Sequence, residues 1–246
     1  MVCTCDTPPQ DKARAIGYKP AMDDKTDIIL AAVLKQVPFE GWTSRAVNMA
    51  MARLDLPDGA EHIYAPAGAV GMIGTWSAQM DAQMVAQIKG FDLETMRIRD
   101  KVTEAVWARL NLIAGHEEAA RRAVARLSLP DSAGRGAAQL WATADAIWTA
   151  IGDTSEDYNY YTKRTILSGV IGSSLISWLA DDTDDKSAAR AFLERRIGNV
   201  MQFEKFKGQT LGALSGLPKP SEFSNLFKKG AFRRRRPYRA YPRQKS

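Results

Sequence analysis

Apolar residues separated by three and four positions recur from residue 24 to about residue 207, and this spacing constrains the fold more than any other feature of the sequence. It is typical of helices that bury one face, whereas the apolar and polar alternation of a strand is almost absent. The sequence therefore predicts an all-α fold, a bundle of about nine helices followed by an amphipathic and basic tail. With 246 residues, of which 45% are hydrophobic and 25% charged, such a chain can bury its own core.

The same pattern predicts where the helices and domains lie. We expect helices over 26–36, 43–53, 66–89, 92–114, 116–127, 132–151, 157–180 and 183–207. Pro38 should stop the first helix and Thr43 should cap the second, while His62 should lie in a loop. The expected domains are a flexible N-terminus (1–22), a helix-turn-helix-like region (23–65), a helical domain (66–208), a linker (209–220) and an amphipathic and basic tail (221–246).

Positive charge is concentrated in the tail. Nine Lys and Arg residues follow Glu222, and subtracting them from the net charge of +6 leaves −3 for the rest of the chain. Both anionic lipid and nucleic acid suit such a tail, but the phenylalanines beside it favour lipid, because they can enter the headgroup boundary while arginines hold phosphates. The residues expected to dock on a membrane are Phe223, Leu226, Phe227, Lys228, Lys229, Arg233 and Arg234.

The residues that an enzyme needs are scarce. Only two histidines occur, and His116 is expected to be a solvated residue at a helix start. The sequence has no zinc-protease, nucleophile-elbow, P-loop or dinucleotide-binding motif. Cys3 and Cys5 could together bind a soft metal, but two free thiols are the simpler interpretation. The sequence therefore predicts no catalytic residue, no metal site and no cofactor.

Four aspartates, Asp181, Asp182, Asp184 and Asp185, precede the last predicted helix. Calcium binding is one interpretation, but Lys186 stands where a loop of the EF-hand type requires glycine. Capping of the helix N-terminus by carboxylates explains the cluster more simply.

The predicted helices 132–151 and 157–180 form an antiparallel pair that shares an apolar seam. Most seams of this kind are plain core, but small residues such as Gly172 and Ser174 either permit close helix contact or leave space for an apolar guest. A lipid site in this seam is expected at Trp141, Trp148, Leu167, Val170, Ile171, Ser174 and Trp178.

The run DYNYYTKR, residues 157–164, combines tyrosines and charged residues at a helix start. Tyr160, Tyr161 and Arg164 are spaced to share an exposed patch with Asp157, and tyrosine and arginine are residues that anchor protein interfaces. Buried tyrosines with satisfied hydroxyls are an equally good interpretation of the same spacing.

The longer run WATADAIWTAIGDTSEDYNYYTKRTILSGVIGSSL, residues 141–175, resembles the signature of a family of ubiquinone (coenzyme Q) biosynthesis accessory proteins, that of the ninth coenzyme Q protein. The resemblance centres on D-T-S-x-D-[aromatic]-N-[aromatic]-Y-T-K-R at residues 153–164 and extends more loosely back to about residue 24. For a bacterial-type member it implies an all-helical fold like that of TetR regulators, commonly a homodimer. It also implies an apolar cavity for isoprenoid lipid, contact with demethoxyubiquinone hydroxylase, and no enzymatic activity of its own.

Carried over by position, the resemblance implies a partner surface at Asp145, Ile147, Asp157, Tyr160, Tyr161 and Arg164. Tyr160 departs from the family pattern, which usually has tryptophan there, so the aromatic anchor is kept and a hydroxyl is added. The resemblance further implies membrane attachment through a C-terminal amphipathic helix. The expected location is therefore peripheral, on the inner face of the cytoplasmic membrane.

Two functions compete at this point. The first is an accessory protein that binds an isoprenoid quinone precursor or phospholipid at the membrane and presents it to the hydroxylase. The second is a TetR-like DNA-binding regulator with a hydrophobic ligand pocket, which the helix pair within residues 26–53 favours. Residues 60–64, AEHIY, lack the basic side chains that reading a DNA groove requires, so the sequence disfavours nucleic acid as a partner.

Overall fold

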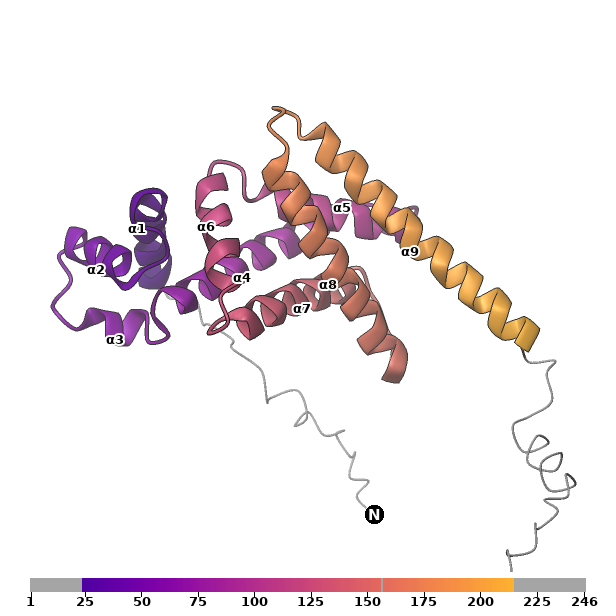
Figure 1. Ribbon diagram of the computed structural model, residues 1–246, viewed down its shortest axis with the longest axis horizontal. Helices are drawn as coiled ribbons and strands as arrows, with labels where there is room; N and C mark the ends of the chain where they lie inside the picture. Colours follow the sequence, from indigo (N-terminus) through magenta and orange to yellow (C-terminus); the bar gives the residue numbers. More distant parts are fainter. Residues whose placement is uncertain (1–23, 156, 215–246) are drawn as a thin grey trace, which may run out of the picture. The chain divides into compact units, whose positions relative to one another are not determined.

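The structure, a computed structural model, describes residues 24–155 and 157–214. This part of the chain consists of helices and connecting turns, which confirms the all-α prediction (Figure 1). The helices are α1 (Asp24–Glu40), α2 (Ser44–Arg53), α3 (Ala60–Tyr64), α4 (Gly68–Ile88), α5 (Ile98–Asn111), α6 (Glu117–Leu127), α7 (Ala133–Ala150), α8 (Asp157–Ala180) and α9 (Ser187–Leu214). None of them is both long and apolar enough to cross a bilayer.

The chain divides into two compact units, residues 1–199 and 200–246. The first unit holds α1 to α8 and the first half of α9, and everything described below belongs to it. In the second unit, the described residues are the remainder of α9 up to Leu214. The helix therefore continues six residues into the segment for which the sequence predicts a linker.

α4 is the central helix of the first unit, and it packs against α1, α2, α5, α6 and α7. Its apolar side chains recur every four residues and are all buried; they are Met72, Trp76, Met80, Met84 and Ile88. One face of a helix buried in this way forms the core of a bundle, and the flexible thioether of methionine fills irregular gaps in it.

The first three helices are fixed to this body through Trp42, which lies in the turn between α1 and α2. Its indole Nε1–H donates to the carbonyl oxygen of Ala119 in α6 at 2.9 Å, and its ring centre lies 5.7 Å from that of Trp76 in α4. Thr43 caps α2 as predicted, because its Oγ1 accepts a hydrogen bond from the Ala46 N–H at 3.2 Å. The helix-turn-helix-like region is thus packed into the same unit as the rest of the body.

The helix limits predicted at Pro38 and Asp92 are wrong. Pro38 does not end α1 but lies in its last turn, which closes when the Gly41 N–H donates to the Val37 carbonyl at 2.8 Å. A proline removes one backbone donor without preventing its neighbours from keeping helical dihedrals. α5 begins at Ile98 rather than at Asp92, whose carboxylate accepts a 2.8 Å bond from the Thr95 hydroxyl and so stabilises a local turn instead.

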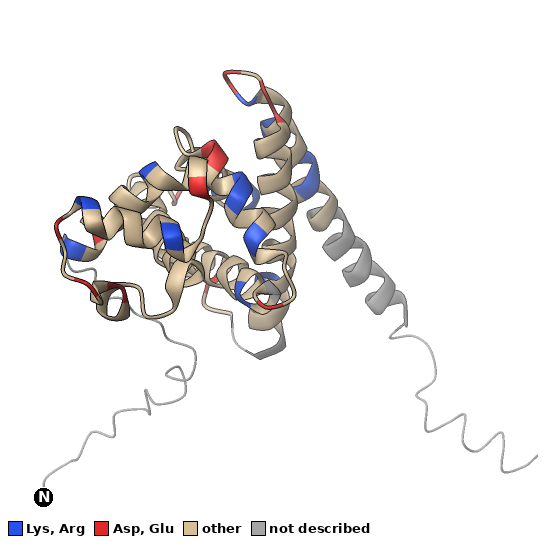
Figure 2. Cartoon of the chain, turned by 60° about the vertical axis from the view of Figure 1, so that its left-hand side comes forward, with Lys and Arg blue, Asp and Glu red and all other residues tan. Residues whose placement is uncertain are grey.

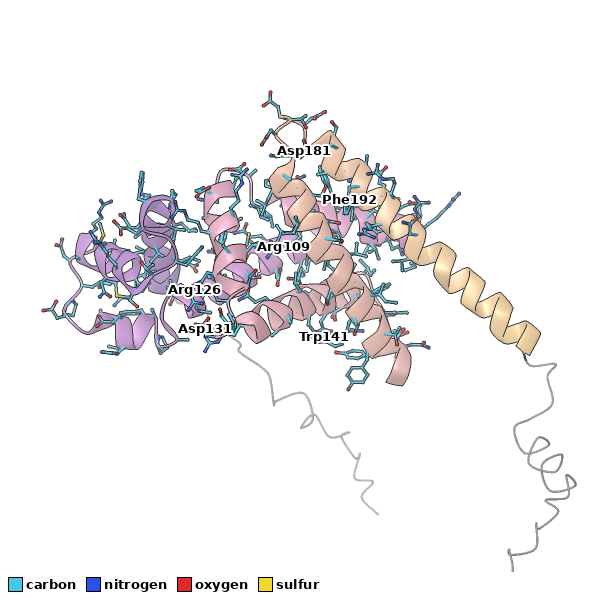
Figure 3. The ribbon with its side chains drawn as sticks, viewed as in Figure 1. Arg109, Arg126, Asp131, Trp141, Asp181 and Phe192 are labelled. Carbon is cyan, nitrogen blue, oxygen red and sulfur yellow. The ribbon has the colours of Figure 1, made fainter. Side chains whose placement is uncertain are left out.

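The position of His62 differs from expectation, and the acidic turn before α9 shows how the start of that helix is capped. His62 lies in the short helix α3, not in a loop. The helix start at α9 is satisfied by Asp181, whose Oδ2 accepts from the Ala189 N–H at 2.8 Å and whose Oδ1 accepts from the Thr183 N–H at 3.0 Å. Figure 2 shows this turn as a cluster of acidic residues between α8 and α9, and Figure 3 labels Asp181 in it. Capping by these carboxylates is therefore confirmed, since Asp185 Oδ1 also accepts from the Ser187 N–H at 3.1 Å.

Candidate functional site

A cavity of about 400 Å³ lies among α4, α5, α6, α7 and α8. Its volume is within the range of small-molecule binding sites, and most of its wall is apolar. α6 contributes small side chains, Ala120 and Ala123, which leave space that larger residues would fill. The wall formed by α8 consists of Ile171, Gly172, Leu175 and Ile176.

The cavity extends from the buried centre of the body to its surface. Ile73, Leu110 and Thr143 line it where side chains are fully buried. Ile176 lines it too and is 53% exposed, and Ala137 near the start of α7 is also exposed. These exposed lining residues mark the mouth of the cavity, between α7 and α8.

Gly172 shows why small residues are needed on α8. A Cβ atom at this position would lie 3.2 Å from Cδ1 of Leu140 on α7, closer than most van der Waals contacts. Glycine therefore permits the close approach of α7 and α8 at a point that is also part of the cavity wall. The two interpretations of the small residues, close packing and space for a guest, hold together at this residue.

Of the seven residues expected to bind lipid, Ile171 lines the cavity and the other six do not. Leu167, Val170, Ser174 and Trp178 are buried core residues of α8 outside its wall. The remaining two residues, Trp141 and Trp148, are half-buried and contact polar residues. Trp148 donates to the Lys163 carbonyl at 3.4 Å, and Trp141 stacks on Tyr161. Lipid binding by these six residues stays a prediction. The cavity lies elsewhere and does not support it.

A buried polar network adjoins the cavity, and the sequence analysis did not identify it. The Arg109 Nε–H on α5 donates to Asp81 Oδ1 on α4 at 2.6 Å, and Nη2 donates to the Ser77 hydroxyl at 3.1 Å. The Thr143 hydroxyl on α7 bonds both Asp81 oxygens at 3.0 Å. Arg109, Ser77 and Thr143 line the cavity, and Arg109 is only 7% exposed. Figure 3 labels Arg109 inside the helical body.

Burial raises the pKa of Asp81 above its ordinary value. The positive charge of Arg109 and the hydrogen bonds from Arg109 and Thr143 lower the same pKa without offsetting the burial. A charged pair held in this way is costly to desolvate, so it is kept only where its geometry and hydrogen bonds are good.

A second polar cluster joins the C-terminal half of α7 to the first turns of α8; we call Asp145, Asp153, Tyr160, Tyr161 and Arg164 the tyrosine–arginine cluster. The Arg164 Nε–H donates to Asp145 Oδ1 at 2.6 Å, and the Tyr160 hydroxyl donates to the same oxygen at 3.1 Å. Tyr161 stacks on Trp141 with ring centres 6.1 Å apart and is 62% exposed. The exposed part of the cluster therefore combines the aromatic ring of Tyr161 with the partly exposed carboxylate of Asp145.

The structure corrects the expected exposure of one partner-surface residue, Arg164. Arg164 is 3% exposed and lies beneath the tyrosines rather than on a shared exposed patch, since it pairs with Asp145 and Asp153. Ile147 is fully buried, because it points into the core that α7 shares with its neighbours. The side chain of Asp157 lies outside the described residues, as do the expected membrane-docking residues between Phe223 and Arg234.

Lys163 completes this region on α8. Its Nζ donates to Asp153 Oδ1 at 2.7 Å and lies 5.0 Å from the ring centre of Trp148. Burial raises the pKa of Asp153, but the bonds from Lys163 and Ser155 outweigh it, so the pKa lies below its ordinary value. Among the described residues, no three His, Cys, Asp or Glu side chains lie together as a set of metal ligands.

Comparison with known proteins gives matches to one family. Residues 133–204, which include α7 and α8, match the COQ9 family model. The ubiquinone biosynthesis protein COQ9, mitochondrial, of Drosophila melanogaster is 26% identical over 188 residues, which is 75% of this chain and 57% of that protein. The Homo sapiens protein of the same name is 26% identical over 179 residues, 70% of this chain and 56% of the relative. The chain thus spans somewhat over half the length of these relatives.

Among solved structures, the TetR transcriptional regulator from Nitrosomonas europaea ATCC 19718 matches with a TM-score of 0.58 and 15% identity. The match covers 72% of this chain and 97% of that chain, and it confirms the expected TetR-like arrangement of helices. The family model falls on the two helices that carry the tyrosine–arginine cluster and one wall of the cavity. By these matches the chain is similar to the COQ9 family model over residues 133–204 and to ubiquinone biosynthesis proteins named COQ9 over 70–75% of its length.

Proposed function

We propose that this chain is an accessory protein of ubiquinone biosynthesis, which binds an isoprenoid quinone precursor at the membrane and presents it to demethoxyubiquinone hydroxylase. The observation that carries the proposal is the largely apolar cavity of about 400 Å³, with a mouth at Ile176. The names of the relatives, which are ubiquinone biosynthesis proteins, support the pathway. The role is that of a carrier rather than an enzyme.

Mass spectrometry of an organic extract tests whether the purified protein carries isoprenoid lipid. The full chain is produced in cells that make ubiquinone, purified and extracted, and an isoprenoid quinone or its precursor is expected in the extract. Ile176→Trp should block the mouth and remove most of this lipid, because the residue is both exposed and part of the wall. Ile63→Trp, which changes an exposed isoleucine on α3 outside the cavity, is the matched control and should retain the lipid. An extract free of isoprenoid lipid would contradict the proposal.

The hydroxylase contact is proposed at the exposed part of the tyrosine–arginine cluster. Tyr161→Ala removes an aromatic side chain from the surface and should weaken capture of the hydroxylase by about tenfold or more, as loss of an aromatic anchor does. Phe39→Ala, which removes a ring that is 82% exposed on α1, should leave capture unchanged. Equal capture by both variants and the unaltered chain would exclude this surface.

We further propose a peripheral location on the inner face of the cytoplasmic membrane, through residues 221–246. The net positive charge of this segment and its phenylalanines support docking on anionic lipid. Removing residues 221–246 should abolish flotation with vesicles that contain anionic lipid, and unchanged flotation would refute the role of the segment.

DNA binding is the second candidate, and the TetR-like arrangement of helices favours it. The first helices argue against it, because α3 has five residues with Glu61 among them, and Asp55 and Asp58 precede it. Figure 2 shows acidic and basic residues interspersed on this part of the chain in its view. Selection from a random duplex library should therefore enrich no site; an enriched site that competes at physiological salt would establish the regulator instead.

A further inference from the structure

We propose that Arg109 anchors the guest of the cavity by donating a hydrogen bond to a neutral carbonyl oxygen, so that the head of an amphiphile enters first and its tail leaves through the mouth. This inference rests on the proposed lipid-binding function and adds to it the orientation and the head-group chemistry of the guest.

The first observation is that two N–H donors of the Arg109 guanidinium have no hydrogen-bond acceptor among the described side chains. Of its five N–H groups, Nε–H bonds Asp81, one on Nη2 bonds Ser77, and one on Nη1 makes a weak 3.4 Å contact with the sulfur of Met80. The other two N–H groups, one on each terminal nitrogen, have no acceptor among the described side chains. Buried donors of this kind almost always have a partner, and here the adjoining space is the cavity that Arg109 lines.

The second observation is the balance of charge. Asp81 lies 2.6 Å from Arg109 and forms an ion pair with it, so the pair presents donors without a large net charge. A neutral acceptor, such as a quinone carbonyl, can accept from these donors without leaving a charge unpaired in the core. A phosphate or carboxylate would bring a second negative charge to a site that already holds one, at a cost in desolvation.

The third observation is the depth of the network. Arg109, Ser77 and Thr143 are all buried, whereas Ile176 at the other end of the same cavity is 53% exposed. A guest that bonds Arg109 therefore has its oxygen-bearing end inside and its other end toward the mouth.

The volume agrees with this orientation. At roughly 30 Å³ for each water-sized group, 400 Å³ holds roughly a dozen non-hydrogen atoms. A substituted benzoquinone ring is of that size, whereas a polyprenyl tail is much larger. A head of this size fits the volume of the cavity, while a long tail must extend out of it.

Equilibrium dialysis of the full chain with three probes tests the proposal. The probes share a ten-carbon tail and differ in the head: a decyl-substituted benzoquinone, decylbenzene and decyl phosphate. The unaltered protein should bind the quinone about tenfold or more tightly than decylbenzene, because hydrogen bonds to charged groups contribute that much, and it should bind decyl phosphate more weakly than the quinone.

Matched variants distinguish loss of the Arg109 hydrogen bond to the guest from loss of folding. Asp81→Asn with Arg109→Gln removes both charges together and should reduce the preference for the quinone to about twofold or less. Glu104→Gln with Arg190→Gln removes an ion pair outside the cavity and should keep the preference. Helix content from circular dichroism checks folding. Should the first double variant not fold, Arg109→Lys keeps the charge beside Asp81 without the forked guanidinium, and it should also lose the preference.

Each contrary outcome has one meaning. Two outcomes would overturn the role of Arg109 without affecting the proposal that the cavity binds lipid. The first is equal binding of decylbenzene and the quinone to the unaltered protein, and the second is an unchanged preference for the quinone in the Arg109 variants. Tighter binding of decyl phosphate than of the quinone would overturn the inference that the site selects a neutral carbonyl group. Failure of the unaltered protein to bind all three probes would overturn both the anchor and the proposed carrier function.

Discussion

The guanidinium of Arg164 lies over the ring of Tyr160, with Cζ 3.4 Å from the ring centre, while both side chains bond the same oxygen of Asp145. The hydroxyl of Tyr160 therefore has a partner within the chain. Burial and the bond to Asp145 raise the pKa of Tyr160, so it remains a neutral donor at ordinary pH.

Tyr160→Phe should lower the free energy of unfolding by about 1 kcal/mol, because the ring stays under Arg164 while the hydrogen bond to Asp145 is lost. Urea unfolding measures the change. Tyr160→Trp keeps an aromatic ring without the hydroxyl and should cost a similar amount. If Tyr160→Phe is as stable as the unaltered chain, the hydroxyl contributes nothing to the cluster.

Arg164→Met should cost about 3 kcal/mol, since it leaves the buried carboxylate of Asp153 with one cation fewer and removes the group that holds Tyr160 in place. Thermal or urea unfolding gives the value. Arg196→Met on α9 is the control: this arginine is exposed, and its loss should change stability by less than about 0.5 kcal/mol. Equal stability of the two variants would show that the Arg164 pairs do not stabilise the fold.

Asp181→Asn should reduce stability in a pH-dependent way. Hydrogen bonds from the Thr183 hydroxyl and from the Ala189 and Thr183 N–H groups lower the pKa of Asp181 below 3.8. A carboxyl group whose pKa is lowered by folding contributes stability above its ordinary pKa, and that stability is lost as the pH falls through the lowered value. The difference between the unaltered chain and the variant should therefore be full near pH 6 and shrink below about pH 4.

Unfolding free energies measured from pH 6 down to pH 3 check the Asp181 prediction. Asp182→Asn, at the exposed neighbouring position, is the control and should follow the unaltered chain. A difference that stays constant with pH would mean that the charge of Asp181 is not what caps α9.

Trp42→Phe should lower the free energy of unfolding by about 1 kcal/mol, because the indole N–H that bonds the Ala119 carbonyl is lost while an aromatic ring is kept beside Trp76. The amount of lipid extracted from the purified variant should not change, since Trp42 does not line the cavity. Loss of lipid in this variant would show that the position of α1 and α2 controls the cavity.

The sequence predicted the helices well and the cavity poorly, for physical reasons. Spacing of apolar residues identifies a buried face, as it does for the stripe of α4. Spacing does not show whether facing side chains meet or leave space, since that depends on the approach of several helices. The cavity is lined by residues of α4, α5, α6 and α7 that were not candidates, and by the face of α8 that begins at Ile171.

One signal for the polar network was present in the sequence. Arg109 follows Val106 by three positions and Val102 by seven, so it falls on the apolar face of α5. A basic residue at such a position needs an acidic partner inside the core, and Asp81 holds the corresponding place among the methionines of α4. By contrast, the burial of Arg164 could not be read from spacing, because Tyr160 and Asp145 cover it only when α7 and α8 pack together.

α8 carries Arg164 near one end and Ile176 near the other, twelve positions along the same rod, or about 18 Å. One helix therefore forms part of both the tyrosine–arginine cluster and the wall of the cavity mouth. A substitution that displaces α8 should consequently disturb both places at once.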